Sequence, residues 1–495
     1  MGFKSRTKDG VSRLAPAVFI VVLAQPLAGC LLTDKLDPAL DIPAAYTAGP
    51  KSQRAAEAAL PPLDWWRGFK SRELTEIIEQ ARESNLDIAA AIARITQADA
   101  QSRIAGAALL PIVDADGGVT KSKSSQNINN TGVGGNKGVG GGRARTVYSA
   151  SLTASYEIDF WGKNRSALRA AEQSAVAARF DREVVSLATV TTAANAYFQV
   201  LGAQDQLRVA RDNLTSATRV LNLIKQRLDA GTASELDTSQ QESVVNSLRA
   251  NIPPLEQTLQ QNRAALAVLM GMTPERVKIR GGSLRAIAIP RVTPGLPSEL
   301  ITQRPDIRLA EAQLASVDAD VERARTDLLP SITLTGTGGY QSAALKTLFE
   351  PQSTFYSLAA GLTQPIFEGG RLIGAVDLQK GRQDEFMQSY RKAVISSFSD
   401  VEVALTAIRQ TAEAERLQAQ VVASSRRAFD ISEQRLNEGT VDLVTVLNTQ
   451  QTLYQAQNAL AQARLLRLQA IVGLYQALGG GWLPKPKIVE QADAR

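Results

Sequence analysis

The chain of 495 residues lacks histidine altogether, contains a single cysteine and has few aromatic residues, 5% of the total. Without histidine the chain cannot form a Ser–His or Cys–His catalytic pair, and the common zinc sites lose a main ligand. A single cysteine excludes a disulfide within the chain. Lys and Arg form no stripe with interleaved aromatic residues, so nucleic-acid binding has no support. We therefore expect a protein that is not an enzyme and that needs no cofactor or metal.

Residues 1–29 have the pattern of a secretory signal. A basic stretch from Lys4 to Arg13 precedes an apolar run from Leu14 to Ala24, which is shorter than the ~20 residues that span a bilayer as a helix. The segment ends in Leu27-Ala28-Gly29-Cys30, which resembles a bacterial lipobox with Cys30 as the lipid attachment site. A buried free thiol after an ordinary signal is the alternative. Leu31, in place of Asp, resembles the sorting pattern for the outer membrane.

The chain repeats itself. Gln226–Thr232 (QRLDAGT) recurs as Gln434–Thr440 (QRLNEGT), an offset of 208 residues, and Leu109–Pro111 recurs as Leu328–Pro330, an offset of 219. Several matches at a nearly constant offset indicate duplication of a unit of half-protein size. The division that follows is a signal peptide (1–29), a lipid-anchored segment (30–70), a first repeat (71–280), a second repeat (281–482) and a C-terminal tail (483–495).

Each repeat contains two segments in which apolar and polar residues alternate, as in β-strands with two unlike faces. The clearest runs from Tyr148 to Ile158, where the polar positions are mostly Ser and Thr. Strands are expected near 112–120, 147–158, 331–340 and 355–366. A length of about 9–11 residues suits a tilted transmembrane strand. A soluble sandwich is the alternative, but small polar faces and aromatic residues near the strand ends favour a membrane barrel.

Long helices are expected around the strands. Helical segments run into the two Leu-Leu-Pro sequences, and no proline occurs from Ile112 to Ile252 or from Ile366 to Leu483. Leucines recur every seven residues from Leu207 to Leu228, which is typical of helices packed along a shared seam. A helix from about Asn164 to Ala230 would be roughly 100 Å long, and Gly231 and Gly439 are expected to end two such helices. A soluble coiled-coil rod would explain the helices but not the strands.

Four strands cannot close a barrel, since small membrane barrels need about eight, and an open edge in lipid leaves backbone groups unpaired. Several chains must therefore pool their strands. The fold class that we predict is mainly α with membrane β: long antiparallel coiled-coil helices plus four transmembrane strands per chain. Three chains would give twelve strands, and hence a trimeric 12-stranded β-barrel on an α-helical barrel, and the function that follows is a conduit.

Several motifs occur in a defined order between Leu63 and Trp482, behind the lipobox. They are Trp65-Trp66 followed by Phe69, the Leu-Leu-Pro pair, Glu157-Ile-Asp-Phe-Trp-Gly-Lys163, Leu300-Ile-Thr-Gln-Arg-Pro-Asp-Ile307 and the two Gln-Arg-Leu-x-x-Gly-Thr sequences. Together they resemble the TolC-type outer membrane factors, and most closely the lipoprotein branch that serves resistance-nodulation-division efflux pumps. The resemblance implies a homotrimer in the outer membrane lipid, extending into the periplasm. It also implies a periplasmic adaptor (membrane fusion protein) and an inner membrane pump of the resistance-nodulation-division class as partners.

The resemblance places the adaptor contact and the closed aperture at the helix tips far from the barrel. The tip residues are Gly231, Thr232, Gly439 and Thr440, although a plain helix-ending glycine would have the same pattern. Many relatives narrow the aperture with an Asp and an Arg. The matching positions here are Asn448 and Gln451, with Val444 one turn earlier, so a charged latch is not expected. Asp237 and Asp442 are nearby acids that either face the lumen or lie on solvated surface.

The function that we predict is the exit duct of a tripartite efflux pump, for passive export of small molecules across the outer membrane. Two alternatives remain at this point. One is the outer membrane duct of a type I protein secretion system, which the lipobox disfavours. The other is a lipid-anchored coiled-coil scaffold without a pore.

Overall fold

The computed structural model describes Tyr46 and residues 61–123, 144–292 and 297–482. The expected signal segment, Cys30 and the C-terminal tail lie outside the described residues. The chain divides into two compact units. In the described part, the sheet unit comprises Arg103–Ala170 and Val317–Met387, and the helical unit comprises the remaining residues.

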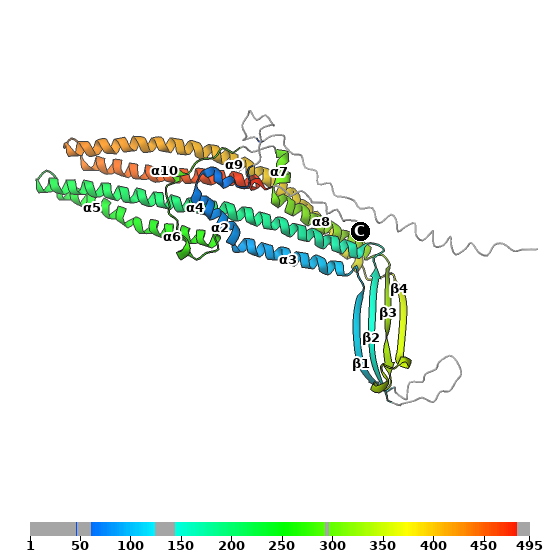
Figure 1. The fold of residues 1–495 in the computed structure, drawn as a ribbon. Helices are drawn as coiled ribbons and strands as arrows, with labels where there is room; N and C mark the ends of the chain where they lie inside the picture. The colour runs from blue at the N-terminus through cyan, green and yellow to red at the C-terminus, as the bar shows by residue number, and fades with distance from the viewer. Residues whose placement is uncertain (1–45, 47–60, 124–143, 293–296, 483–495) are drawn as a thin grey trace, which may run out of the picture. The chain divides into compact units, whose positions relative to one another are not determined.

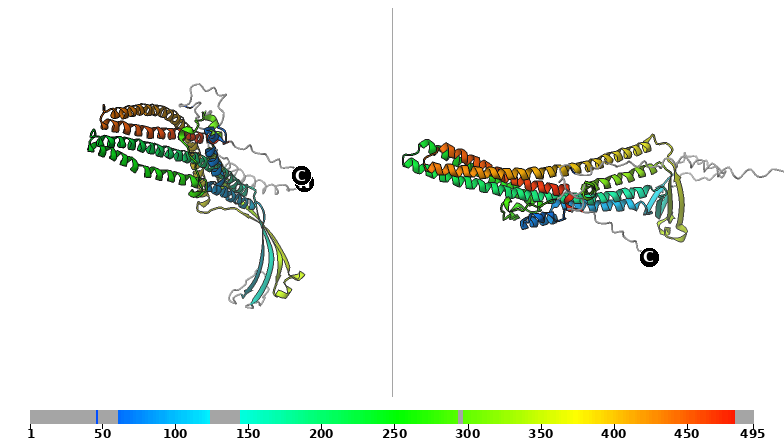
Figure 2. Two further views of the ribbon diagram at one scale, coloured as in Figure 1. Left: turned by 60° about the vertical axis from the view of Figure 1, so that its left-hand side comes forward. Right: turned by 90° about the horizontal axis from the view of Figure 1, so that it is seen from above.

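The sheet unit contains the four expected strands. Their bounds are β1 (Ile112–Ser122), β2 (Arg145–Ile158), β3 (Ser331–Ser342) and β4 (Thr354–Thr363). They form one sheet in the order β1-β2-β3-β4, and every neighbouring pair is antiparallel (Figure 1). Figure 2 shows that this sheet is curved and does not close on itself. The period-2 pattern therefore predicted the strands correctly, because alternation is the local signature of a sheet with two unlike faces.

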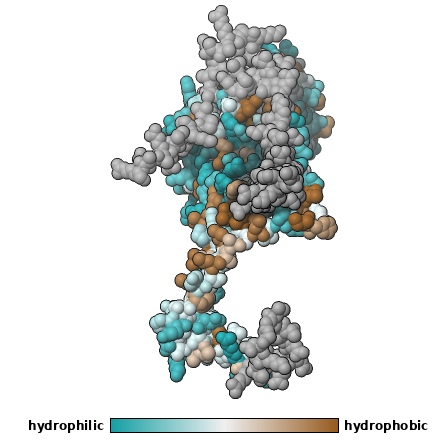
Figure 3. Space-filling model, turned by 90° about the vertical axis from the view of Figure 1, so that its right-hand side faces the viewer, coloured by the Kyte–Doolittle hydropathy of each residue, from teal (hydrophilic) through white to brown (hydrophobic). Residues whose placement is uncertain are grey.

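The pairing register separates the side chains of the sheet into an apolar and a polar face. On the apolar face, Leu152 of β2 lies opposite Ala115 of β1, and Ile332 of β3 lies opposite Leu362 of β4. The polar face carries Ser and Thr, and the hydroxyls of Thr153 and Thr337 lie 3.4 Å apart across β2 and β3. In Figure 3, hydrophobic residues gather along the upper part of the sheet and hydrophilic ones at its lower end.

The helices follow the same order in both halves of the chain. Their bounds are α2 (Arg72–Ser84), α3 (Leu86–Ala107), α4 (Lys163–Asp229), α5 (Glu235–Ala250), α6 (Ile252–Leu269), α7 (Pro297–Gln303), α8 (Pro305–Thr326), α9 (Arg371–Asn437) and α10 (Leu443–Ala477). The two long helices, α4 and α9, each contain 67 residues. α5 and α10 run back beside α4 and α9 as antiparallel partners (Figure 1). The long helices ended by Gly231 and Gly439 are thus confirmed.

Two of the four heptad leucines of α4 are buried, and the other two, Leu214 and Leu228, are half-buried. In the helical unit, Leu207 and Leu221 of α4 and Val446 and Leu453 of α10 are buried. One helix of the described residues, α4, includes a stretch long and apolar enough to cross a membrane, but 56% of that stretch is buried inside the protein. Burial of this kind is typical of a core helix, and the apolar residues of α4 fill the seam between helices.

The largest core of the helical unit surrounds the Trp-Trp-Phe motif. A short 3-10 helix, η2 (Trp65–Phe69), buries Trp65 and Phe69 almost completely. The ring of Trp65 stacks on Tyr475 of α10 at 4.6 Å, and Phe69 contacts Phe198 of α4 at 5.2 Å. The motif therefore joins the N-terminal part of the described chain to the end of α10 and to the middle of α4.

Candidate functional site

The first helix tip closes with a Schellman motif at Gly231. The amide of Gly231 donates to the carbonyl of Leu228 at 2.9 Å, and the amide of Thr232 donates to that of Arg227 at 2.8 Å. Gly231 has φ +72°, a left-handed conformation in which a Cβ is strained. The hydroxyl of Thr232 also donates to the Arg227 carbonyl at 3.1 Å. The left-handed conformation of Gly231 and the hydroxyl of Thr232 thus both contribute to the exposed end of α4.

The second tip has the same geometry 208 residues later. Gly439 has φ +74°, its amide donates to Leu436 at 3.0 Å, and the amide of Thr440 donates to Arg435 at 2.9 Å. The Thr440 hydroxyl donates to the Arg435 carbonyl at 3.2 Å. The four tip residues named from the sequence therefore form two equivalent turns with exposed backbones.

Side chains of α4 and α9 join the two tips. The guanidinium of Arg227 donates to the carbonyl of Leu436, at the end of the other long helix. Two turns earlier, Arg219 makes a bidentate pair with Glu433, at 2.8 and 3.0 Å. An apolar cluster that includes Ile224, Phe429 and Leu436 lies beside these contacts. The tips within one chain are consequently held together by both polar and apolar contacts.

Both acidic residues near the tips serve as helix caps. The Asp237 carboxylate accepts hydrogen bonds from the amide (2.9 Å) and hydroxyl (2.8 Å) of Ser234, and this capping box begins α5. Asp442 is the N-cap of α10 and accepts from the Thr445 amide at 2.9 Å. Hydrogen bonds from the side chain and backbone of Thr445 lower the pKa of Asp442. Asp237, which we placed at the aperture, is half-buried and has this capping role in the single chain.

The other aperture candidates share one exposed face of α10. Val444, Asn448 and Gln451 are all exposed, and their spacing of four and three residues places them on one side of the helix. The opposite side is buried through Val446 and Gln450. Neither amide side chain makes a hydrogen bond to another described residue. The three residues thus lie together on an exposed surface, which could contact a partner or face a lumen.

A groove lies beside the first tip. Its volume is about 710 Å³, and it is lined by Thr218, Arg219, Leu223, Gln226, Arg249 and Asn437, among others. These residues come from α4, α5 and α9, so the groove runs between the two hairpins of the chain. Its walls are both polar and apolar, which fits a protein partner better than a small apolar ligand.

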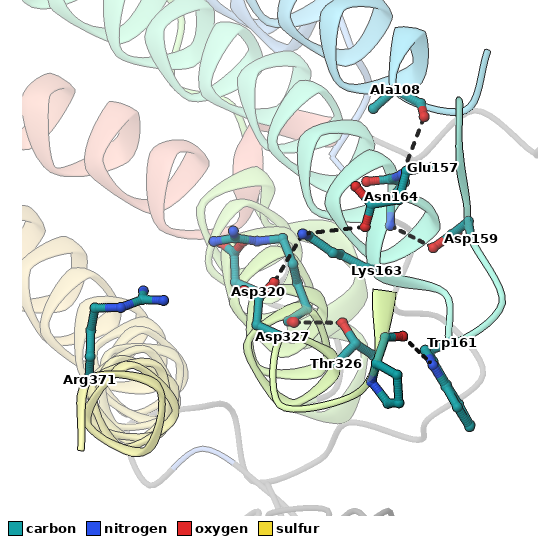
Figure 4. Close-up of polar contacts among 12 residues, drawn as sticks. Ala108, Glu157, Asp159, Trp161, Lys163, Asn164, Asp320, Thr326, Asp327 and Arg371 are labelled. Carbon is teal, nitrogen blue, oxygen red and sulfur yellow. Dashed lines mark hydrogen bonds and ion pairs between the residues drawn. The ribbon is translucent and has the colours of Figure 1, made fainter. Parts of the chain in front are cut away.

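The Glu157–Lys163 motif forms the turn from β2 into α4 in the sheet unit (Figure 4). Asp159 accepts from the backbone amides of Asn164 (3.0 Å) and Arg165 (2.9 Å) at the start of the helix. The ammonium of Lys163 lies between Glu157 (3.6 Å) and Asp327 (3.3 Å). The motif is therefore a charged, well-capped corner in which no group is arranged as a nucleophile.

Trp161 of the same turn contacts the second repeat. Its indole nitrogen donates to the carbonyl of Pro330 at 2.9 Å, just before β3 (Figure 4). The side-chain amide of Asn164 donates to the carbonyl of Ala108, after α3, at 3.2 Å. The first contact ties the β2–α4 turn to the residue that precedes β3, and the second ties the start of α4 to the end of α3.

Comparison with known proteins identifies this arrangement. The family model described as outer membrane efflux protein matches residues 77–272 and 296–480, which is more than half of the chain. The chain belongs to the outer membrane efflux protein family. It is an outer membrane channel component of efflux pumps, and not an enzyme.

Relatives of this efflux protein support the assignment over nearly the whole chain. The pyoverdine export outer membrane protein OpmQ of Pseudomonas putida is 40% identical, over 88% of this chain and 92% of that protein. The toluene efflux pump outer membrane protein TtgF, also of P. putida, is 31% identical, over 93% and 96%. The open state of the Neisseria gonorrhoeae MtrE outer membrane channel superposes with a TM-score of 0.80 at 26% identity, covering 91% of this chain and 98% of that one.

Sequence reasoning missed two structural sites of the efflux protein. Arg464 of α10 donates to the carbonyls of Leu284 (3.2 Å) and Ile287 (2.7 Å) and pairs with Glu415 of α9 at 3.0 Å. The Gly-Gly-Gly run at 479–481 adopts φ between +63° and +77°. The glycine run was visible in the sequence, but no local pattern marks Arg464, because its partners are about 50 and 180 residues away.

Proposed function

We propose that three copies of this chain form the outer membrane exit duct of a tripartite efflux pump. Each copy contributes four strands to a 12-stranded barrel, and the helical hairpins continue the lumen as an α-barrel. The helix tips contact a periplasmic adaptor, which links the duct to an inner membrane pump of the resistance-nodulation-division class. Transport through the duct is passive.

The open sheet is the observation that carries the proposal. β1 is exposed along its whole length, and β4 is exposed at every residue but Phe355. Since β1 and β4 are the two edges of the sheet, each leaves a row of backbone groups unpaired in a single chain, which lipid does not tolerate. Pairing β4 of one copy with β1 of the next satisfies both edges at once, and antiparallel order is kept around the ring.

The two faces of the sheet support the same arrangement. Tyr356, Leu358 and Leu362 of β4 lie on the apolar face and are 84%, 81% and 70% exposed. An apolar face this open is costly in water and suits contact with lipid tails. Phe367, just beyond β4, is 89% exposed and lies where an interfacial aromatic is expected. The Ser/Thr face would then line a wet lumen.

The aperture in this proposal closes through amides and packing. Val444, Asn448 and Gln451 of three copies would converge around the axis, so six amide side chains would bond to one another. Amide hydrogen bonds carry no net charge, so closure would depend less on salt than a ring of ion pairs. The groove beside the first tip offers a helical adaptor both Arg and apolar contacts.

Lipid attachment at Cys30 is part of the proposal. The lipobox pattern supports it, as does the use of the chain's single cysteine at that position. Several acyl chains on one residue hold a protein firmly at a membrane, whereas one chain alone holds it marginally. Mass spectrometry of the mature N-terminus would show either a lipidated Cys30 or an unmodified thiol, and the second result would remove the anchor from the proposal.

We also propose that residues 71–280 and 281–482 are two copies of one ancestral unit. Both contain a helix before Leu-Leu-Pro, a strand pair, a 67-residue helix, a Gly-Thr turn and a return in the opposite direction. The return is continuous in α10 but divided into α5 and α6 in the first repeat, where Pro253 and Pro254 follow Asn251. Three copies of a two-repeat chain would surround the lumen with six similar hairpins.

A wide passive duct need not select the compound that it exports. Relatives at 29–41% identity are named for export of pyoverdine and for efflux of toluene, solvents and antibiotics, which are chemically unlike. A wide lumen with small polar walls can pass all of these. Pyoverdine is the first substrate to test, because OpmQ of P. putida is 40% identical.

The decisive experiment measures mass and conductance. The full chain, purified in detergent, is expected to have the protein mass of a trimer by light scattering, and to give discrete conductance steps in planar bilayers. A monomer without conductance would refute the duct. Affinity capture from native membranes is expected to recover an adaptor and a pump of the resistance-nodulation-division class. Recovery of an ATP-driven transporter of a protein secretion system would instead assign the duct to type I secretion.

A further inference from the structure

The two repeats are equivalent in strand register as well as in sequence. In the first repeat, Ile112 of β1 pairs with Ser155 of β2. Adding the sequence offsets of 219 and 208 residues gives 331 and 363, and Ser331 of β3 does pair with Thr363 of β4. A shift that reproduces the pairing residue for residue shows that equivalent positions of the two repeats have equivalent neighbours in the sheet.

At the tips, the same shift exposes an unmatched contact. Arg227 of the first repeat donates to the carbonyl of Leu436 in the second. Shifted by 208 residues, the donor becomes Arg435 and the acceptor becomes Leu228. Within the part of the chain that the structure describes, the side chain of Arg435 has no hydrogen-bond or ion-pair partner and is exposed. The Leu228 carbonyl accepts the Gly231 amide, as Leu436 accepts that of Gly439.

The surroundings of Gly231 and Gly439 show the same difference: an Arg side chain lies beside Gly439 but not beside Gly231. A Cβ added to Gly439 would lie 3.8 Å from Nη2 of Arg227, so the guanidinium lies against the second tip. A Cβ added to Gly231 would meet nothing within 4 Å in the single chain. The first tip thus has the shape and the acceptor of a guanidinium site, while its counterpart already holds Arg227.

We propose that Arg435 of one copy donates to the main-chain carbonyl of Leu228 in the next copy around the trimer. The proposal rests on the trimer of the proposed function and adds the partner atoms at its tip. In a cyclic trimer, each first-repeat tip has a second-repeat tip of its own chain on one side and one of the neighbouring chain on the other. The donor–acceptor contact then repeats six times in one direction around the ring.

The six arginine–carbonyl links are of two kinds, within one chain and between chains. Three of them, from Arg227, connect tips of one chain and can persist while chains move apart. The three from Arg435 connect different chains and must break if the tips separate. A guanidinium directed at a carbonyl that already ends a helix is favourable, because carbonyls at a helix C-terminus carry partial negative charge. Arg435 is therefore a positioning residue for the closed tip.

Photocrosslinking tests the neighbour directly. p-Benzoylphenylalanine is incorporated at position 435 or, as the matched control, at position 227 of the full chain, and the products are separated by mass and sequenced. From position 435 we expect covalent dimers and trimers, with the crosslink in residues 228–232 of another copy. From position 227 we expect a crosslink near residues 436–440 of the same chain, without a rise in mass.

Light scattering on the same samples separates the two possible failures. A trimer in which position 435 crosslinks only within its own chain, or not at all, overturns the Arg435 contact and leaves the duct standing. A wild-type chain that is itself a monomer overturns both. The wild-type chain is measured beside each variant, so a loss of assembly caused by the probe itself would be seen, and Arg435→Lys then provides a milder variant for the conductance measurement.

Conductance in planar bilayers tests the consequence. With Arg435→Ala we expect the open fraction to rise roughly a hundredfold, since the variant removes three links per trimer and each net hydrogen bond is worth roughly fivefold in an equilibrium. Arg435→Lys should give a smaller rise, because one ammonium donates fewer bonds than a guanidinium. Arg426→Ala removes an exposed cation nine residues earlier, on the opposite side of α9, and should leave the open fraction unchanged. Equal effects of Arg435→Ala and Arg426→Ala would refute the contact.

Discussion

At the scale of single residues, the phenol of Tyr197 is held in the main core of the helical unit. It donates to Glu73 at 3.0 Å, and the hydroxyl of Ser71 lies 3.4 Å away. Burial, the largest cause, and the Glu73 carboxylate together raise the pKa of Tyr197 to about 12, against an opposing effect of Ser71. The phenol is therefore neutral, and bonded to a carboxylate, at every physiological pH.

This pKa shift predicts alkaline destabilisation. Because the folded value lies above the unfolded value of 10.0, the stabilisation is fully present below pH 10 and is lost as the pH rises through about 12. Tyr197→Phe should cost about 1.5–3 kcal/mol at pH 8, since the bond is to a charged group. The variant should also lose less stability than the wild type when the pH is raised from 10 to 12, because it has no phenol at position 197 to ionise. Thermal unfolding in detergent checks both, with Tyr454→Phe as the control because that phenol makes no hydrogen bond to a described residue.

A second residue-scale prediction concerns Gly479, which ends α10. Its φ is +77°, and an added Cβ would lie 2.4 Å from the backbone oxygen of Gln303. Backbone cannot move aside as a flexible side chain can, so Gly479→Ala should destabilise the helical unit by more than about 2 kcal/mol. Gly473, inside α10, has nothing within 4 Å of its added Cβ. Gly473→Ala should therefore be neutral or stabilise by about 0.5–1 kcal/mol. Similar unfolding temperatures for the two variants would contradict this reading.

At the scale of elements, the sequence predicted what local patterns encode. Alternation indicated the four strands, and the two Gly-Thr sequences indicated the ends of α4 and α9, because these features depend on neighbours a few residues away. It did not predict the capping role of Asp237, although Ser234 three residues earlier is the signal of a capping box. Contacts such as that of Arg227 with Leu436 join positions 209 residues apart and need the assembled hairpins.

The N-caps of α5 and α10, the helices that follow the two tips, differ in chemistry. This difference can be tested by changing the pH. The N-cap residue of α5 is Ser234, whereas that of α10 is Asp442, whose lowered pKa means that its cap is strongest as a carboxylate. The contribution is present above the unfolded value of 3.8 and is lost as the pH falls through the lower folded value.

Hydrogen exchange at the Thr445 amide reports this cap, since that amide donates to Asp442. Asp442→Ala should speed exchange at neutral pH, because the first turn of α10 loses its acceptor. Asp442→Asn should keep most of the protection, because Asn is also a good N-cap, but should remove its dependence on acid. The comparison is made between the wild type and Asp442→Asn below pH 4. If the Thr445 amide of the wild type keeps the same protection relative to the variant there, the charge of the carboxylate does not matter for the cap.

At the scale of the whole molecule, the repeat offsets predict how one chain meets the next in the barrel. Within a chain, Leu152 of β2 pairs with Gly338 of β3. Shifting β2 forward by 208 and β3 back by 219 converts this pair into Ala360 of β4 and Val119 of β1 in the next copy. The edge strands carry small or apolar residues on this face, so the pairing places Ala360 and Val119 side by side toward lipid.

Cysteine pairs can test this register, because a disulfide needs Cα atoms closer than about 7 Å. Ala360→Cys with Val119→Cys should join different copies and yield covalent trimers on oxidation. Ala360→Cys with Ala115→Cys, on the same face but four residues away along β1, should not, because four strand residues span about 13 Å. Leu152→Cys with Gly338→Cys is the counterpart within one chain and should oxidise without raising the mass. Covalent trimers from the Ala115 pair instead of the Val119 pair would mean that the junction between chains has a different register from the junction between repeats.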